Sequence, residues 1–375
     1  MKLKRISLLV LMLVMSLVLA ACGSSPQETF TKSVEKTAEP ADQSTTTIGI
    51  KVDELPATLK ADQSAAMLEG LSVKLTVSDD QKQQKSAATI AVKTAGLVSL
   101  NVNLDLLVDS KAEKVYFPLS DLYDEKGNLT TLLDQLTSGM FSKIKEENPD
   151  LVTKYVDLST LSEELSGKEA KKSETDTKEV EKATKDLSKK VTKTVSDYFN
   201  SLPEDRFKEG DNGEITLNLT KADFTTLATK ISELLDDKAI KADLKVIAES
   251  QGVSGEAFDK QYKSMAKSFD DAIQSVKDET NAKIDVTVTI QPDKNDNIES
   301  MKMEVKITDS KDKDKPETLG MTITMKTTDS AKLPKFPSSS DIISTEALQK
   351  IISESTASYY KSLYGDTNTD TTEIQ

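Results

Sequence analysis

Few residues in this chain could carry chemistry. The 375 residues include no histidine and no tryptophan, and Cys22 is the one cysteine. Without histidine, Ser-His-Asp and Cys-His nucleophilic catalysis and imidazole metal ligands are excluded. Paired carboxylates could still act as in a glycosidase, but the Asp and Glu residues are scattered over polar stretches. We therefore predict that the protein is not an enzyme and that it holds no cofactor and no metal.

Cys22 ends a segment typical of a bacterial export signal. Lys2, Lys4 and Arg5 make the start basic, and an apolar run extends from Ile6 to Leu19. This run is shorter than the roughly 20 residues that a permanent membrane span needs. The sequence Leu19-Ala20-Ala21-Cys22 follows at its end and resembles the lipobox of bacterial lipoproteins.

The lipobox resemblance implies a particular processing. Residues 1–21 would be a lipoprotein signal peptide, removed after the Cys22 thiol has received diacylglycerol. The lipid attachment site would be Cys22, and several acyl chains would hold the protein stably on the membrane. We expect the protein on the outer face of the bacterial cell membrane. An ordinary secretory signal with a chance cysteine and an uncleaved anchor are the alternatives.

Composition narrows the choice of partners. The net charge is −14, and the only arginines are Arg5 and Arg206. Nucleic acid is excluded as a partner, because phosphate binding needs clustered basic residues. If the cysteine carries lipid, no disulfide can form within the chain, so the fold must rest on apolar burial.

The chain after the signal divides by pattern. Residues 22–44 are rich in Ser, Thr, Glu and Pro, and we interpret them as a flexible tether that lifts the domain off the membrane. Residues 45–360 are predicted to form an α+β domain. Within it, a charge-mixed polar insertion occupies about 159–177. Residues 361–375 are predicted to be a disordered tail.

Alternation of apolar and polar residues predicts strands in two separate parts of the domain. The N-terminal part holds five candidate strands: Ile48–Val52, Leu71–Val77, Ile90–Val92, Val98–Val108 and Lys114–Pro118. The C-terminal part holds three: Ile284–Ile290, Met301–Ile307 and Leu319–Met325. One more strand, Ile215–Leu219, lies between the two parts. Each part is predicted to be an antiparallel meander with one apolar face.

Helical periodicity predicts the helices that pack on that apolar face. Asn128 is expected to cap a single helix that ends at Asn148-Pro149, and a capping box is expected at Thr220 to Asp223. The predicted helices are 128–148, 180–199, 220–235, 254–276 and 348–359. We expect the two meanders to join edge to edge in one curved antiparallel sheet, half-barrel-like, covered by these amphipathic helices.

This arrangement, behind a lipobox and a tether, resembles the LolA/LppX-type half-barrel lipoproteins and the uncharacterised Gram-positive lipoproteins similar to them. The resemblance covers roughly Thr45 to Tyr360 and rests on element order and alternation. It implies an apolar cavity between sheet and helices for acyl chains. It supplies no binding residues, and the chain differs in its lack of tryptophan and its polar insertion.

Methionines provide the one candidate ligand lining. Met301, Met303, Met321 and Met325 share the apolar phase of neighbouring predicted strands, and we expect Met265 on a helix that faces them. Flexible thioethers adapt to irregular ligands, but they also fill ordinary cores.

A partial calcium-loop pattern lies near the C-terminal strands. Asp293, Asn295 and Asn297 are followed by Glu304 at the twelfth position, but Ile298 stands where the loop needs glycine. We interpret the segment as a hairpin turn.

Two main functions follow as hypotheses, and an enzyme that uses two carboxylates converging in a cleft is the third alternative. The first is a membrane-anchored extracytoplasmic protein that binds or carries a lipid or another hydrophobic ligand. The second is a tethered module with a solid core that binds an envelope protein or polymer. An open apolar cavity between sheet and helices would favour the first, and a filled interior would favour the second.

Overall fold

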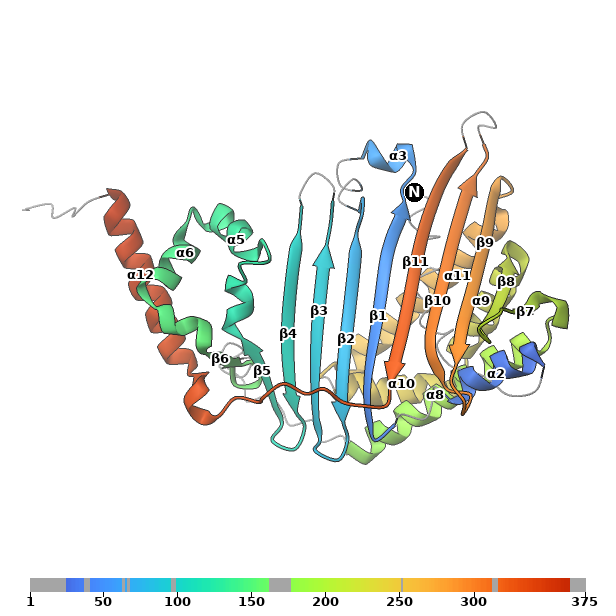
Figure 1. The fold of residues 1–375 in the computed structure, drawn as a ribbon, viewed down its shortest axis with the longest axis horizontal. Helices are drawn as coiled ribbons and strands as arrows, with labels where there is room; N and C mark the ends of the chain where they lie inside the picture. The colour runs from blue at the N-terminus through green and yellow to red at the C-terminus, as the bar shows by residue number, and fades with distance from the viewer. Residues whose placement is uncertain are drawn as a thin grey trace, which may run out of the picture.

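The computed structural model describes residues 25–36, 41–62, 65, 68–95, 99–161, 177–250, 252–311 and 316–364. These residues form helices and one large curved sheet that is not closed (Figure 1), which confirms the predicted α+β class. Cys22, most of the predicted polar insertion and the chain after Tyr364 lie outside the described residues.

The sheet has twelve strands in the order β12-β6-β5-β4-β3-β2-β1-β11-β10-β9-β8-β7. All neighbouring strands are antiparallel except β12 and β6. Strand β1 (Gln43–Glu54) pairs with β2 (Ser72–Asp80) on one side and with β11 (Glu317–Thr328) on the other. The N-terminal and C-terminal meanders are therefore one sheet, as predicted.

The longer strands confirm the alternation pattern, whereas the short ones were not predicted. The remaining long strands are β3 (Lys85–Lys93), β4 (Asn101–Asp109), β5 (Lys114–Pro118), β8 (Ile215–Thr220), β9 (Ala282–Pro292) and β10 (Ile298–Asp309). The unpredicted strands are β6 (Tyr155–Asp157), β7 (Phe207–Glu209) and β12 (Ile342–Ile343). Two or three residues are too few to show a period of two.

Helices α8 (Thr177–Asn200), α9 (Lys221–Leu235) and α11 (Gly255–Asp278) lie behind the sheet (Figure 1), and α10 (Lys238–Ser250) packs mainly against α8. Helices α8, α9 and α11 form the first core together with the strands, and this core includes Phe199, Phe224, Phe269, Leu217 and Ile290. Helix α10 was not predicted. It starts where the carboxylate of Asp237 accepts a hydrogen bond from the Ala239 N–H at 2.7 Å.

A second core lies at the other end of the sheet, around Leu119, Tyr123, Ile144, Leu151 and Val156. The helical elements at this end are η1 (Leu119–Tyr123), α5 (Leu129–Thr137), α6 (Met140–Glu147), η2 (Pro149–Thr153) and α12 (Thr345–Tyr364). Since α12 extends to Tyr364, the predicted tail from residue 361 begins too early.

The single helix predicted for 128–148 is wrong, because the chain breaks between α5 and α6. Ser138 and Gly139 both have positive φ, 55° and 90°. Ser138 ends α5 in the left-handed conformation, which glycine and a few polar residues tolerate best. Asn128 also does not cap α5 with its side chain, and its Oδ1 accepts instead from the Asn101 N–H at 2.8 Å.

The tether predicted for 22–44 is also wrong where the structure describes it. Residues Pro26–Lys36 form helix α2, and Phe30 and Val34 on that helix are each 1% exposed in the first core. Strand β1 begins at Gln43. The signal for α2 was present, because Ser25, Pro26 and Glu28 are typical of an N-cap, a first helical position and a capping-box partner.

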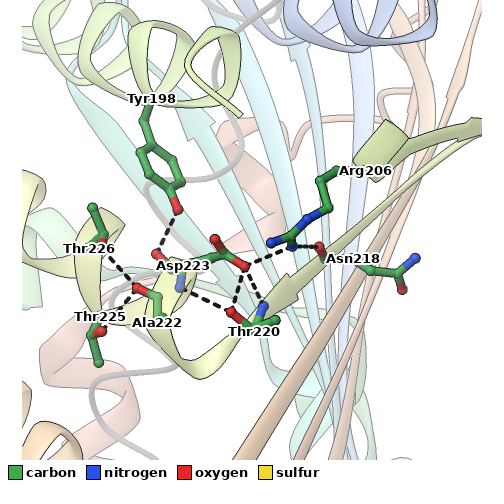
Figure 2. Close-up of polar contacts among 8 residues, drawn as sticks. All are labelled: Tyr198, Arg206, Asn218, Thr220, Ala222, Asp223, Thr225 and Thr226. Carbon is green, nitrogen blue, oxygen red and sulfur yellow. Dashed lines mark hydrogen bonds and ion pairs between the residues drawn. The ribbon is translucent and has the colours of Figure 1, made fainter. Parts of the chain in front are cut away.

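The predicted capping box at the start of α9 is confirmed (Figure 2). The Asp223 carboxylate accepts from the Thr220 N–H at 2.8 Å, and the Thr220 hydroxyl accepts from the Asp223 N–H at 3.3 Å. Arg206 Nη1 donates to the same carboxylate at 2.9 Å, and the Tyr198 hydroxyl donates to the Asp223 carbonyl at 2.9 Å. Burial raises the pKa of Asp223, but the hydrogen bonds from Thr220 and Arg206 outweigh burial and hold it below its ordinary value.

An extended connection links the two ends of the sheet. It leaves β11, crosses in front of the lower ends of β1 to β4 and reaches η4 (Ser339–Asp341) and α12 (Figure 1). The Thr45 hydroxyl donates to the Ser330 carbonyl at 2.7 Å, and the Lys85 ammonium lies 4.5 Å from the centre of the Phe336 ring. These contacts hold the connection on the polar face of the sheet.

Candidate functional site

One face of the sheet is apolar across eight strands. Residues directly opposite one another form a first row: Leu217, Val288, Met303, Ile323, Ile50, Val73, Val92 and Val102, on β8, β9, β10, β11, β1, β2, β3 and β4. A second row runs beside it: Ile215, Ile290, Met301, Met325, Ile48, Leu75, Ile90 and Leu104. The face is therefore continuous from one core towards the other.

The side chains of this face are buried to different extents on different strands. On β8 to β11, the members of both rows are at most 4% exposed, and all of them belong to the first core. On β1, Ile48 and Ile50 are half-buried and pack against that core. On β2 to β4 the face is half-buried at every apolar position of the two rows except Val102, which is 7% exposed.

The section on β2, β3 and β4 belongs to neither core within the described part of the chain. We call it the open apolar face and define it by Val73, Leu75, Val77, Ile90, Val92, Leu104 and Leu106. From the spacing of strands and residues, it measures about 10 Å across and 13 Å along the strands between Cα positions. We take this contiguous apolar surface as the candidate site for a ligand or partner.

Polar groups border the open apolar face. At one end, the Ser86 hydroxyl donates to Asp79 Oδ1 at 2.6 Å. On the opposite side of the same strands polar residues alternate with Ala87, Ala91 and the buried Leu107, and the Thr89 hydroxyl donates to Asp105 Oδ1 at 2.6 Å. The continuous rows of apolar residues therefore lie on one side of β2 to β4.

The candidate methionines do not line this face. Met301, Met303 and Met325 are at most 4% exposed in the first core, and Met321 packs against that core. The prediction that Met265 faces them is wrong, because its side chain is 41% exposed on α11 and lies outside both cores. The sequence placed the strand methionines on one face, but periodicity could not tell which part of the face would be covered.

A pocket lies at the edge of the second core. It has a volume of about 660 Å³ and includes Asp121, Tyr123, Lys126 and Lys145 in its lining. The Asp121 carboxylate accepts a hydrogen bond from the Asp105 N–H on β4. Burial raises the pKa of Asp121 to about 6, although that hydrogen bond acts against the shift. Asp121 thus joins η1 to the part of β4 that extends beyond β5.

The calcium-loop pattern forms a hairpin turn between β9 and β10, as we interpreted it. Asp293 Oδ1 accepts from the Asn295 and Asn297 N–H groups at 2.7 and 2.8 Å, and Glu304 pairs with Lys302 at 2.7 Å. Among the residues with described positions, no group of three or more His, Cys, Asp or Glu side chains could hold a metal ion.

Comparisons with known proteins assign nothing further to this chain. No family model, no curated protein and no solved structure matches it. Of the helices in the described ranges, none has both the length and the hydropathy of a membrane span. The geometry of the open apolar face is therefore the basis for the function proposed below.

Proposed function

We propose that the protein is an extracytoplasmic lipoprotein, anchored through Cys22 to the outer face of the bacterial membrane, that carries a lipid or another hydrophobic ligand. The ligand would bind on the open apolar face. The observation that carries this proposal is that Leu75, Ile90 and Leu104, at the centre of that face, are half-buried and belong to neither core.

The space between the sheet and helices α8 to α11 is filled with side chains of the first core, which is the outcome expected of a solid core in that part of the molecule, so the ligand of our proposal would bind on β2 to β4 and not beneath these helices. Side chains of the first core are nearly inaccessible there, with Leu217, Ile290 and Leu227 each 0% exposed. A ligand covering about 200 Å² of apolar surface on β2 to β4 would gain roughly 5 kcal/mol from burial, before the cost of association. Burial of this kind gives affinity with little polar specificity, which suits a carrier of acyl chains.

Adjacent residues of β3 provide a matched test of the binding face. Ile90 lies on the open apolar face between Leu75 and Leu104, while Ala91 lies on the opposite face, across from Lys74 and Asn103. We expect Ile90→Asp to abolish binding of a fluorescent fatty acid, because a carboxylate would enter the apolar surface. Ala91→Asp should bind as the unaltered protein does, since Lys74 can pair with the new charge.

The outcomes separate the two hypotheses. Circular dichroism and thermal unfolding establish that both variants fold. Equal binding by both folded variants would show that the ligand does not bind on this face. A protein that binds no fatty acid or phospholipid but retains an envelope protein through Ile90 would instead be an interaction module.

The anchor has its own test. Cys22→Ala should abolish the lipid-dependent mobility shift of the protein on gels, because no other thiol is present to receive diacylglycerol. Globomycin, which blocks the lipoprotein signal peptidase, should leave the signal peptide attached. A mobility shift that survives Cys22→Ala would contradict the lipoprotein assignment.

A further inference from the structure

The folded part of the chain begins very close to the predicted lipid. Ser25 follows Cys22 by three residues. The Ser25 N–H donates to Glu28 Oε2 at 2.9 Å, and the Glu28 N–H donates to Ser25 Oγ at 3.1 Å. The Thr29 N–H donates to the Ser25 carbonyl at 2.7 Å. These reciprocal hydrogen bonds form a capping box that fixes the start of α2.

Helix α2 is in turn fixed to the body. Gln27 Nε2 donates to the carbonyls of Phe199 and Leu202, each at 2.8 Å. The Phe30 ring lies 5.5 Å from the Phe199 ring and 5.4 Å from the Phe207 ring, both edge-on. The start of α2 is thus held beside the end of α8 and strand β7. Detaching α2 would expose the Phe30 side chain, which is 1% exposed in the fold.

We propose that the bilayer lies against the β7 end of the molecule. The inference rests on lipidation of Cys22, as proposed above. Three residues span at most about 11 Å, so the start of α2 cannot move further than this from the lipidated residue. We define the membrane-proximal end as the first turn of α2, residues 201–206 and β7. A flexible tether would have imposed no such position.

The short link to the lipid also fixes the distance along the sheet between the membrane-proximal end and the proposed ligand. Six neighbouring-strand steps separate β7 from β2, and eight separate β7 from β4. At about 4.8 Å per step, the open apolar face lies roughly 30 to 38 Å along the sheet from the membrane-proximal end. The attachment point and the binding face are therefore separate places on one rigid sheet.

Single tryptophans can test the position, because the chain contains none. Lys208 on β7 and Lys111 in the β4–β5 turn are both exposed. Protein beginning at Cys22 is coupled through its one thiol to maleimide lipid in phosphatidylcholine vesicles that also contain dansyl lipid. We expect energy transfer to dansyl to be several-fold greater from Lys208→Trp than from Lys111→Trp.

A flexible insertion before α2 is the control for this experiment. A Gly-Ser insertion of about 20 residues between Ser24 and Ser25 adds roughly 25 Å of flexible reach and should make the two signals similar. Equal transfer from both positions without the insertion, or greater transfer from Lys111→Trp, would overturn the inference. Glu209→Trp replaces Lys208→Trp if the latter unfolds. Chemical coupling does not depend on cellular lipidation, so the Cys22→Ala mobility shift can fail independently of this result.

Discussion

Asp121 is a half-buried carboxylate at a junction between elements. It lies in η1 beside the second core and accepts the Asp105 N–H of β4. Strand β5 pairs with β4 only at Leu107, Val108 and Asp109, so Asp105 lies where β4 has no partner strand on this side. The Asp121 side chain therefore supplies an acceptor that the sheet does not.

The Asp121 carboxylate should make stability depend on pH. Burial raises its pKa from 3.8 to about 6, so the folded state binds this proton more tightly than the unfolded state. The stability contributed by the protonated group is fully present below about pH 4 and is lost as the pH rises through about 6. Asp121→Asn does not titrate, so its stability relative to the unaltered protein should be higher at pH 7 than at pH 4.

Urea unfolding of both proteins at the two pH values measures this difference. The comparison cancels the titration of every other group that the substitution leaves unchanged. A stability difference between variant and unaltered protein that is the same at pH 4 and pH 7 would contradict the assigned pKa.

The role of a single residue could be predicted where it depends on a short pattern of neighbouring residues. Thr220 and Asp223 were predicted as a capping box from their spacing, and the hydrogen bonds confirm it. Ser25 and Glu28 have the same spacing, but the polar composition around them favoured a tether instead. Met265 was placed facing the strands because helical periodicity defines a stripe but not the element that covers it.

At the scale of elements, α2 is the largest revision of the sequence interpretation. Its side chains at positions 27, 30, 31, 33 and 34 are buried, so the helix is part of the first core. No disulfide can form within the chain, so this helix, like the rest of the fold, is held in place by apolar burial. An N-terminal segment that is polar on average can still bury a narrow apolar stripe.

Phe30→Ala tests the structural role of α2. Removing a ring that is 1% exposed and contacts Phe199 and Phe207 should cost about 3 to 5 kcal/mol of unfolding free energy. Lys32→Ala on the same helix is the control and should change stability by less than about 0.5 kcal/mol. Guanidinium unfolding provides the measurement, and equal midpoints for the two variants would support a tether.

Breaks and short strands were the elements least accessible from sequence. The leucines of 129–136 and the apolar residues of 140–144 keep helical spacing across Ser138 and Gly139, so periodicity alone continued the helix. The left-handed backbone at Ser138 and Gly139, with φ of 55° and 90°, separates α5 from α6. Strand β12 has two residues and is defined by its parallel partner β6 rather than by a pattern of its own.

At the scale of the whole molecule, the two meanders were predicted to share a sheet, and the pairing of β1 with β11 confirms it. That pairing joins residues such as Ile50 and Ile323, which are far apart in the sequence, and local patterns carry no register for such a contact. The sequence does not show which strands of the sheet the helices would cover. Helices α8 to α11 gather over one end of the sheet and α5, α6 and α12 at the other, which leaves β2 to β4 between two cores (Figure 1).

Photo-crosslinking with a fatty acid shows whether an apolar ligand binds on β2 to β4. Protein beginning at Ser25, which lacks the anchor, is irradiated with a diazirine fatty acid, and the modified peptides are mapped by mass spectrometry. We expect adducts on Val73 to Val77, Ile90 to Val92 and Leu104 to Leu106, and excess unlabelled fatty acid should suppress them. Adducts confined to α8 to α11, or none that unlabelled fatty acid suppresses, would contradict it.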